Sequence, residues 1–151
     1  MSLASLNMAG AANRGSIMTV RHPVDRTPLM FGEGDNKRPI TITLLGKDSD
    51  EWIKAGRRAR QAQRDAAMNR TPWTAADDDA QANEALAAAT VTWEGIPAAW
   101  LTPNGTDETP VECTPANAAK LYANAGVNWL REQVDQHIGE RGNLLKASQI
   151  A

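Results

Sequence analysis

The sequence has few of the residues on which catalytic and metal sites depend. Its 151 residues include one cysteine, Cys113, and two histidines, His22 and His137. A single cysteine excludes an internal disulfide framework and a cysteine-based zinc site. The two histidines are far apart in the sequence and have no third ligand at a compatible spacing, which argues against a zinc site or histidine acid–base chemistry. We therefore expect no enzymatic activity, no cofactor and no metal site.

Other catalytic motifs are missing or incomplete. Gly46-Lys47 followed by Ser49 partly matches a phosphate-binding loop, but the upstream glycine is missing and Asp48 stands where phosphate would bind. No serine has the glycine-flanked pattern of a nucleophile elbow. Cys113 is expected just before a helix N-terminus, a position that lowers a thiol pKa. We nevertheless interpret this lone loop cysteine as incidental.

Long hydrophobic runs are also missing, and large apolar side chains are scarce. No run is long enough to span a bilayer, and the first residues lack the basic and apolar regions of a signal peptide. The single cysteine fits a reducing compartment. The chain has one Phe, one Tyr and five Trp, and much of its apolar fraction is Ala, which buries little surface. We expect a modest core and stability gained through self-association.

Charge is unevenly distributed, although the formal net charge is only −2. Residues 71–112 contain no Lys or Arg and hold eight acidic residues, whereas residues 47–70 hold seven basic and four acidic residues. The two regions either neutralise each other or are simply solvated, which is the interpretation that we favour, or one of their faces meets a charged partner. The acidic total predicts no bulk affinity for nucleic acid.

The N-terminal half predicts a small β-structure. Residues 1–19 are expected to form a flexible arm, with a short helix within residues 3–12 as the alternative, and residues 20–151 to form a single domain. Residues 29–31 and 39–45 are expected to pair as a hairpin around the loop at 32–36. In the second strand Ile40, Ile42 and Leu44 face one way, and Thr41 and Thr43 face the other.

Four helices are expected after this hairpin, which gives a mainly helical α+β domain. The first runs from Ser49 to Asn69 with Asp48 as its cap, and the second covers residues 75–89 with Thr74 as its cap. The acidic residues 77–79 suit the positive end of the second helix, and consecutive helical positions cannot converge on one metal ion. The third helix begins at Thr114-Pro115 with an apolar face, and the last begins with a cap at Asn128. The apolar face of the third helix comprises Ala118, Leu121, Tyr122 and Ala125, and that of the last comprises Leu130, Val134, Ile138, Arg141 and Leu145.

The first long helix predicts two distinct faces. Small residues led by Trp52 form one face (Ala55, Ala59, Ala62 and Ala66), and basic residues form another (Lys54, Arg57, Arg58, Arg60 and Arg64). The basic face lacks interleaved aromatic residues, so a solvated or protein-contacting face is favoured over a DNA-binding one. Among the tryptophans, Trp52, Trp93 and Trp129 are expected in the core. Trp73 and Trp100 lie beside prolines and are the better interface candidates.

The order of several motifs resembles a family. These motifs are VRHP at 20–23, PITITLLGKDSD at 39–50, WEGI at 93–96, TPANAAKL at 114–121, WLREQV at 129–134 and RGNLL at 141–145. Their order is similar to that of the tail assembly chaperones of long-tailed bacteriophages and prophages, over most of residues 20–147. The resemblance implies a protein that coats the tape-measure protein, keeps it soluble, recruits tail-tube subunits and leaves before the tail matures.

This resemblance leads to a functional hypothesis with two alternatives. We expect the client contact on the small-residue and basic faces of the 49–69 helix, with Arg57, Arg60, Arg64, Trp73 and Trp100 as partner-binding residues. One alternative is a structural virion component, such as a head–tail connector or minor tail protein, which would be detected in purified particles by mass spectrometry. The other is a small DNA-binding regulator, which the acidic total disfavours.

Overall fold

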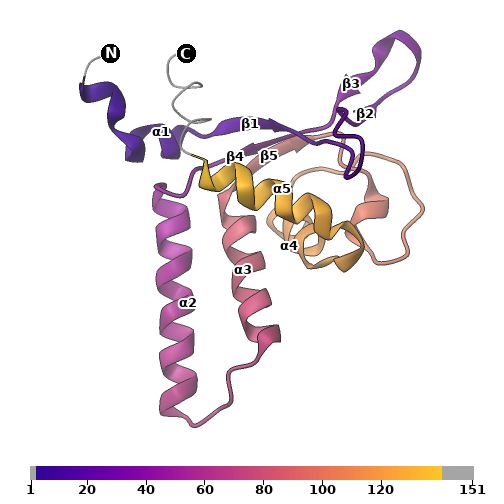
Figure 1. Cartoon of the computed structure of the whole chain (residues 1–151). Helices are drawn as coiled ribbons and strands as arrows, with labels where there is room; N and C mark the ends of the chain where they lie inside the picture. The colour runs from indigo at the N-terminus through magenta and orange to yellow at the C-terminus, as the bar shows by residue number, and fades with distance from the viewer. Residues whose placement is uncertain (1–2, 141–151) are drawn as a thin grey trace.

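The computed structural model describes residues 3–140 and confirms a mainly helical α+β fold (Figure 1). Residues 1–2 and 141–151 lie outside the described part of the chain. The helices are α1 (Met8–Arg14), α2 (Asp50–Met68), α3 (Ala75–Ala89), α4 (Pro115–Ala123) and α5 (Asn128–Gly139), with short 3₁₀ turns η1 (Leu3–Leu6), η2 (Gly34–Asn36), η3 (Ala98–Leu101) and η4 (Ala125–Val127). The strands are β1 (Ser16–Thr19), β2 (Met30–Phe31), β3 (Arg38–Pro39), β4 (Thr41–Leu44) and β5 (Thr90–Glu94).

A three-stranded antiparallel sheet, in the order β1-β4-β5, organises the body of the molecule. Its central strand β4 has the predicted alternation, because Ile42 and Leu44 are buried while Thr41 and Thr43 remain partly exposed. Ile42 pairs with Met18 on one side and with Trp93 on the other. These three side chains therefore meet on the face that the helices cover.

The sheet begins before residue 20, within the segment expected to be a flexible arm. Residues 16–19 form edge strand β1, and residues 8–14 form α1, where the alternative prediction placed a short helix. The strand was missed because its polarity is inverted: Ser16 is 7% exposed, whereas Ile17 is 67% exposed. The backbone N–H of Gly46 donates to the carbonyl oxygen of Ala12 at 3.0 Å, which attaches α1 to the end of β4.

The predicted hairpin exists in a shorter form. Met30 pairs with Pro39 and Phe31 pairs with Arg38, so β2 and β3 make a two-stranded ribbon. The prediction extended the second strand to residue 45, but β4 leaves this ribbon and joins β1 and β5 in the other sheet. Strand β5 was not predicted at all, because its alternation is interrupted at its start by a shift in register beside Leu44.

Helices α2 and α3 form a long antiparallel hairpin that projects away from the sheet (Figure 1). The predicted range of α2 is correct to within a residue at each end, but its N-cap is Ser49, not Asp48. The hydroxyl oxygen of Ser49 accepts the backbone N–H of Trp52 at 3.3 Å, and Ser49 is fully buried. The predicted cap of α3 is confirmed, since Thr74 and Asp77 form a reciprocal capping box.

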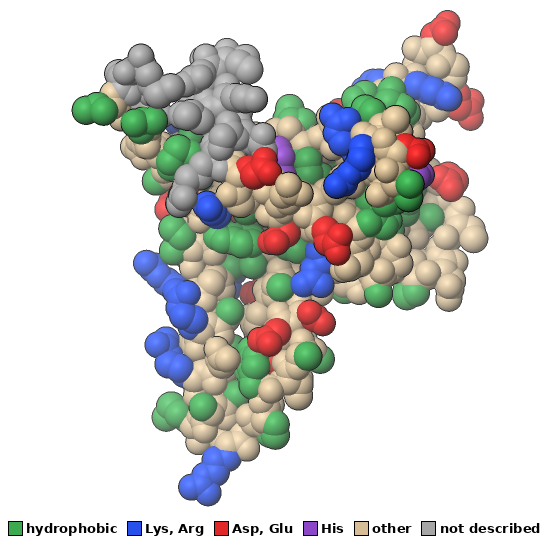
Figure 2. Space-filling model, viewed as in Figure 1, with side chains coloured by type: hydrophobic (Ala, Val, Ile, Leu, Met, Phe, Trp, Pro, Cys, Tyr) green, Lys and Arg blue, Asp and Glu red, His purple; other side chains and the backbone are tan. Residues whose placement is uncertain are grey.

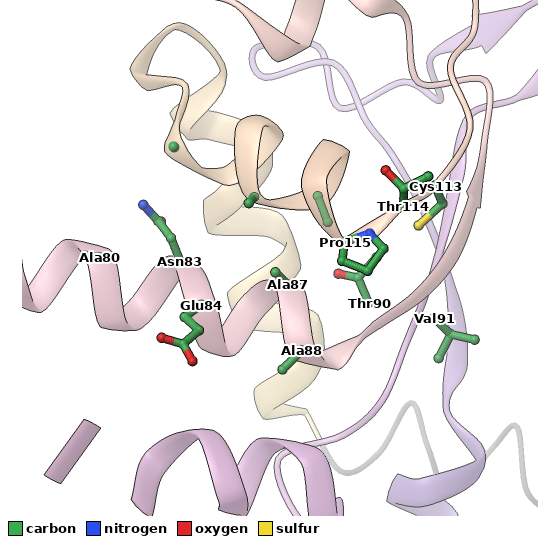
Figure 3. A pocket seen from close by; sticks show the side chains of 13 residues that line it. Ala80, Asn83, Glu84, Ala87, Ala88, Thr90, Val91, Cys113, Thr114 and Pro115 are labelled. Carbon is green, nitrogen blue, oxygen red and sulfur yellow. The ribbon is translucent and has the colours of Figure 1, made fainter. Parts of the chain in front are cut away.

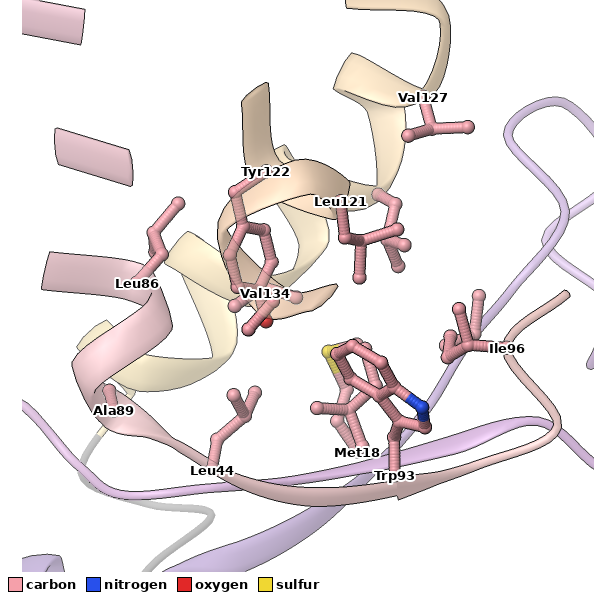
Figure 4. Close-up of a cluster of buried hydrophobic side chains, with 14 of the residues drawn as sticks. Met18, Leu44, Leu86, Ala89, Trp93, Ile96, Leu121, Tyr122, Val127 and Val134 are labelled. Carbon is pink, nitrogen blue, oxygen red and sulfur yellow. The ribbon is translucent and has the colours of Figure 1, made fainter. Parts of the chain in front are cut away.

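The core lies between the sheet and helices α4, α5 and the end of α3 (Figure 4). The predicted apolar faces are largely correct: Ala118, Leu121, Tyr122, Leu130, Val134 and Ile138 are all buried. Ala125 is instead exposed, because α4 ends at Ala123 and a 3₁₀ turn follows. Asn128 is the first residue of α5, not its cap, and the cap position is Val127. The predicted face residues Arg141 and Leu145 lie outside the described residues.

Two partly buried polar contacts lie at the edge of the core. The hydroxyl groups of Thr90 and Tyr122 share a hydrogen bond of 2.6 Å, and the indole N–H of Trp93 donates to the carbonyl oxygen of Val111 at 2.8 Å. Burial raises the pKa of the Tyr122 hydroxyl, which therefore stays protonated. Within residues 3–140, no helix has both the length and the apolar character needed to cross a membrane.

Candidate interaction surfaces

The small-residue face of α2 is largely taken up by contact with α3. Ala55 is buried and Ala59, Ala62 and Ala66 are partly buried, whereas most other positions of α2 are exposed. Helix α3 packs along this side of α2, and α1 contacts α2 as well. Small side chains permit this close packing of two helices. The expectation that this face binds a client is therefore wrong, because another helix of the same chain covers it.

The basic side chains Arg57, Arg60 and Arg64, here called the basic row, lie on the opposite side of α2. They follow one another at spacings of three and four, so they share one face of a helix with about 3.6 residues per turn. All three are exposed. Arg64 donates from Nη2 to Oε1 of Gln61 at 2.9 Å, and the described residues give the basic row no carboxylate partner. Figure 2 shows basic side chains along the outer edge of the projecting hairpin.

Two further cations of α2, Arg58 and Lys54, fall outside this row. Arg58 lies beside the small-residue face and donates from Nε to Oε1 of Glu84 at 3.1 Å, an ion pair between α2 and α3. Lys54 is exposed on the remaining side of α2. Only Arg58 and Glu84 thus support the interpretation in which basic and acidic regions neutralise each other. The basic row remains available to an acidic partner.

Trp73 and Trp100 are both partly buried, and the structure places them in different surroundings. The indole N–H of Trp73 donates to Oδ1 of Asp78 at 2.6 Å, which holds it beside the first turn of α3. Trp100 belongs to η3 and packs edge-on against Trp129, with ring centroids 5.4 Å apart. The two candidate anchors therefore do not form one site. Of the predicted core tryptophans, Trp93 is buried, and Trp52 and Trp129 are partly buried against the core.

A groove of about 730 Å³ lies between α3 and α4, and six of its thirteen lining residues are alanines (Figure 3). The side-chain oxygen Oδ1 of Asn83 is buried there without a hydrogen-bond partner. Cys113 also lines the groove. Burial raises the pKa of its thiol, and the charge of Glu112 adds to this effect. The expectation that this position lowers the thiol pKa is wrong, because desolvation dominates there.

A second groove, of about 520 Å³, lies between the β2–β3 ribbon and the 95–110 segment. Phe31 and Trp100 provide aromatic walls, and Glu33 and Glu108 provide carboxylates. Neither lysine nor arginine lines it. We call it the acidic groove. Sequence reasoning missed it because its two sides come from distant segments; Phe31 and Trp100, for example, are 69 positions apart.

His137 contacts a serine, and this contact has a structural role. Its Nε2 lies 2.7 Å from the hydroxyl oxygen of Ser16. Ser16 is buried and is not among the residues that line the shallow groove beside His137. His22 instead accepts the backbone N–H groups of Val24 and Asp25 through Nδ1. Within residues 3–140 no three His, Cys, Asp or Glu side chains are grouped closely enough to hold a metal ion.

Comparison with known proteins gives no relative for this chain. No protein-family model, no curated protein and no solved structure matches it. The functional argument therefore stands on the motif order and on the surfaces described above.

Proposed function

We propose that this chain is a tail assembly chaperone of a long-tailed phage or prophage. It binds the tape-measure protein in the bacterial host cytoplasm, helps to recruit tail-tube subunits and associates with copies of itself. The order of the motifs between residues 20 and 147 supports this proposal. The proposed function needs no catalytic group, cofactor, nucleic acid or membrane.

The observation that carries the proposal is the exposed basic row on a projecting helix. Arg57, Arg60 and Arg64 span two turns of α2 on the side turned away from α3. A row of this kind complements an acidic stripe along a long helical client. Exposed charges contribute more to the rate and specificity of association than to affinity, and salt screens them. Client binding through the basic row should therefore weaken as the ionic strength rises.

The α2–α3 hairpin is rigid enough to present this row. Its helices pack through the small-residue face, and the capping box of Thr74 and Asp77 fixes the start of α3. A rigid element loses little conformational entropy when it binds. The hairpin therefore holds the three arginines of the basic row in a fixed arrangement.

Charge reversal of the basic row tests this assignment. We expect a variant with Arg57→Glu, Arg60→Glu and Arg64→Glu to keep the far-UV circular dichroism and melting temperature of the wild type. It should lose co-purification with the tape-measure protein. The matched control reverses three exposed cations elsewhere (Arg26→Glu, Lys37→Glu and Lys120→Glu) and should retain the client. Full client binding by the folded basic-row variant would reject the basic row as the client surface.

A further inference from the structure

The end of the α2–α3 hairpin is a small surface with both apolar and positive character. We call Met68, Asn69 and Arg70 the hairpin tip. Met68 is 83% exposed, an unusual exposure for a large apolar side chain. Arg70 is exposed and forms no ion pair with any residue of the described chain. Figure 2 shows a basic side chain at the far end of the projection.

The backbone of the hairpin tip is held in place by hydrogen bonds. The N–H of Arg70 donates to the carbonyl oxygen of Ala67 at 3.2 Å, and that of Thr71 donates to Ala66 at 2.8 Å. Arg70 has a φ of +53°, a left-handed conformation that closes the end of α2. Trp73 lies just beyond and is anchored to Asp78. The backbone of the hairpin tip therefore has a defined conformation before it meets a partner.

The acidic groove has the complementary chemistry. Phe31 and Trp100 offer aromatic surface to a thioether, and Glu33 and Glu108 offer carboxylates to a guanidinium. The guanidinium carbon of Arg38 already lies 5.0 Å from the centroid of the Phe31 ring. This cation–π contact places one cation beside the aromatic wall, although Arg38 is not among the residues that line the groove.

We propose that the hairpin tip of one copy of this chain docks in the acidic groove of a second copy. Met68 would pack on Phe31 and Trp100, and Arg70 would pair with Glu33 and Glu108. The inference rests on the self-association included in the proposed function, and it assigns the surfaces that produce it. It uses neither the basic row nor the client.

The position of the two surfaces determines the kind of assembly. The hairpin tip is at the far end of the α2–α3 projection, and the β2–β3 ribbon that forms one side of the groove is at the opposite end of the molecule (Figure 1). One copy therefore cannot fill its own groove. Because the two surfaces differ, the contact is heterologous, and such contacts build rings or open chains instead of closed two-fold dimers.

The test uses the purified chain alone, in low salt, with its mass measured by sedimentation equilibrium over a range of concentrations. The wild type should rise above the monomer mass of 16.3 kDa as concentration increases. A tip variant (Met68→Ser with Arg70→Asn) and a groove variant (Glu33→Lys with Glu108→Lys) should each weaken association by about tenfold or more. Asn is chosen at position 70 because it tolerates a positive φ.

Mixing the two variants distinguishes this arrangement from others. The groove variant keeps an intact tip and the tip variant keeps an intact groove, so an equimolar mixture should form a one-to-one dimer that grows no further. A wild type that stays monomeric up to about 1 mM would overturn the proposal. So would association that persists in either folded variant, or a mixture that remains monomeric or forms long chains.

A control separates this inference from the proposed function. The variant with Arg57→Glu, Arg60→Glu and Arg64→Glu should self-associate like the wild type even where it fails to bind the client. Loss of self-association in that variant, together with unchanged association of the tip variant, would assign the interface to the basic row and overturn the tip–groove contact.

Discussion

The hydroxyl oxygen of Ser16 lies 2.7 Å from Nε2 of His137, and this hydrogen bond joins residues 121 positions apart. Ser16 is the first residue of β1 and His137 lies in the last turn of α5. Gln133, one helical turn earlier, both accepts the backbone N–H of Arg21 and donates to its carbonyl oxygen. Polar contacts at two points thus attach α5 to the N-terminal edge of the molecule.

The burial of His137 should make stability depend on pH. Burial lowers the pKa of His137 below its usual 6.5, although the charge of Glu140 acts in the opposite direction. Below about pH 6.5 the His137 side chain takes up a proton in the unfolded chain, whereas in the folded chain it stays neutral. The free energy of unfolding should therefore fall as the pH drops from about 6.5 to the lowered pKa of His137 in the folded state. Urea denaturation across this range should show the loss in the wild type. A His137→Gln variant with an unchanged pH dependence would contradict this explanation.

Gly95 is required for the packing of Phe31 at the acidic groove. Its φ is +84°, and an added Cβ would overlap with the ring of Phe31 at Cδ1. We expect Gly95→Ala to lower the free energy of unfolding by about 2–4 kcal/mol, through backbone strain and overpacking. The control is Gly139→Ala, where an added Cβ meets nothing within 4 Å. That helical substitution should be neutral or stabilise by up to about 1 kcal/mol. Equal effects of the two substitutions in urea denaturation would refute the explanation.

The sequence predicts those parts of the fold whose signals are local. Capping residues such as Thr74 and Thr114 mark helix starts, and the alternation around Ile42 marks a strand buried on one face. Strand β1 could not be predicted in the same way, because the polar Ser16 is buried, where it contacts His137, and its apolar neighbour Ile17 faces outward. The partner of Ser16 is 121 positions away, so no pattern within the strand reveals it.

The candidate surfaces show the same difference between features with local sequence signals and features that depend on packing. Helical periodicity predicts that the basic row shares one face, and the structure places Arg57, Arg60 and Arg64 together in exposed positions. Periodicity does not reveal that α3 covers the small-residue face, or that Trp100 packs against Trp129 and lines a groove with Phe31. These features depend on how separate elements pack, so only the folded chain shows them.

The Thr74 cap should stabilise the hairpin measurably. The hydroxyl oxygen of Thr74 accepts the backbone N–H of Asp77, and Oδ2 of Asp77 accepts the backbone N–H of Thr74 at 2.9 Å. We expect Thr74→Ala to lower the free energy of unfolding by about 1 kcal/mol and Thr74→Ser to preserve it. Chemical denaturation of both variants checks this. A loss of equal size in Thr74→Ser would show that the methyl group, and not the hydroxyl, carries the effect.

The ion pair between Arg58 and Glu84 should contribute little energy despite its short distance. Both side chains are about half exposed, at 51% and 52%, so water screens their attraction. A double-mutant cycle with Arg58→Ala and Glu84→Ala should give a coupling energy of about 0.5 kcal/mol or less, and it should shrink in high salt. A coupling that exceeds about 1 kcal/mol and resists salt would indicate that the pair is a rigid link between α2 and α3.

The chaperone proposal is tested most directly by the mass of a complex with its client. The chain is co-expressed with the longest coiled-coil-like protein encoded nearby, the client is affinity-purified, and the mass is measured by light scattering. Our account predicts a soluble complex with many copies of this chain for each client. A client that stays insoluble and recovers none of this chain would contradict the proposal and favour a structural component of the virion.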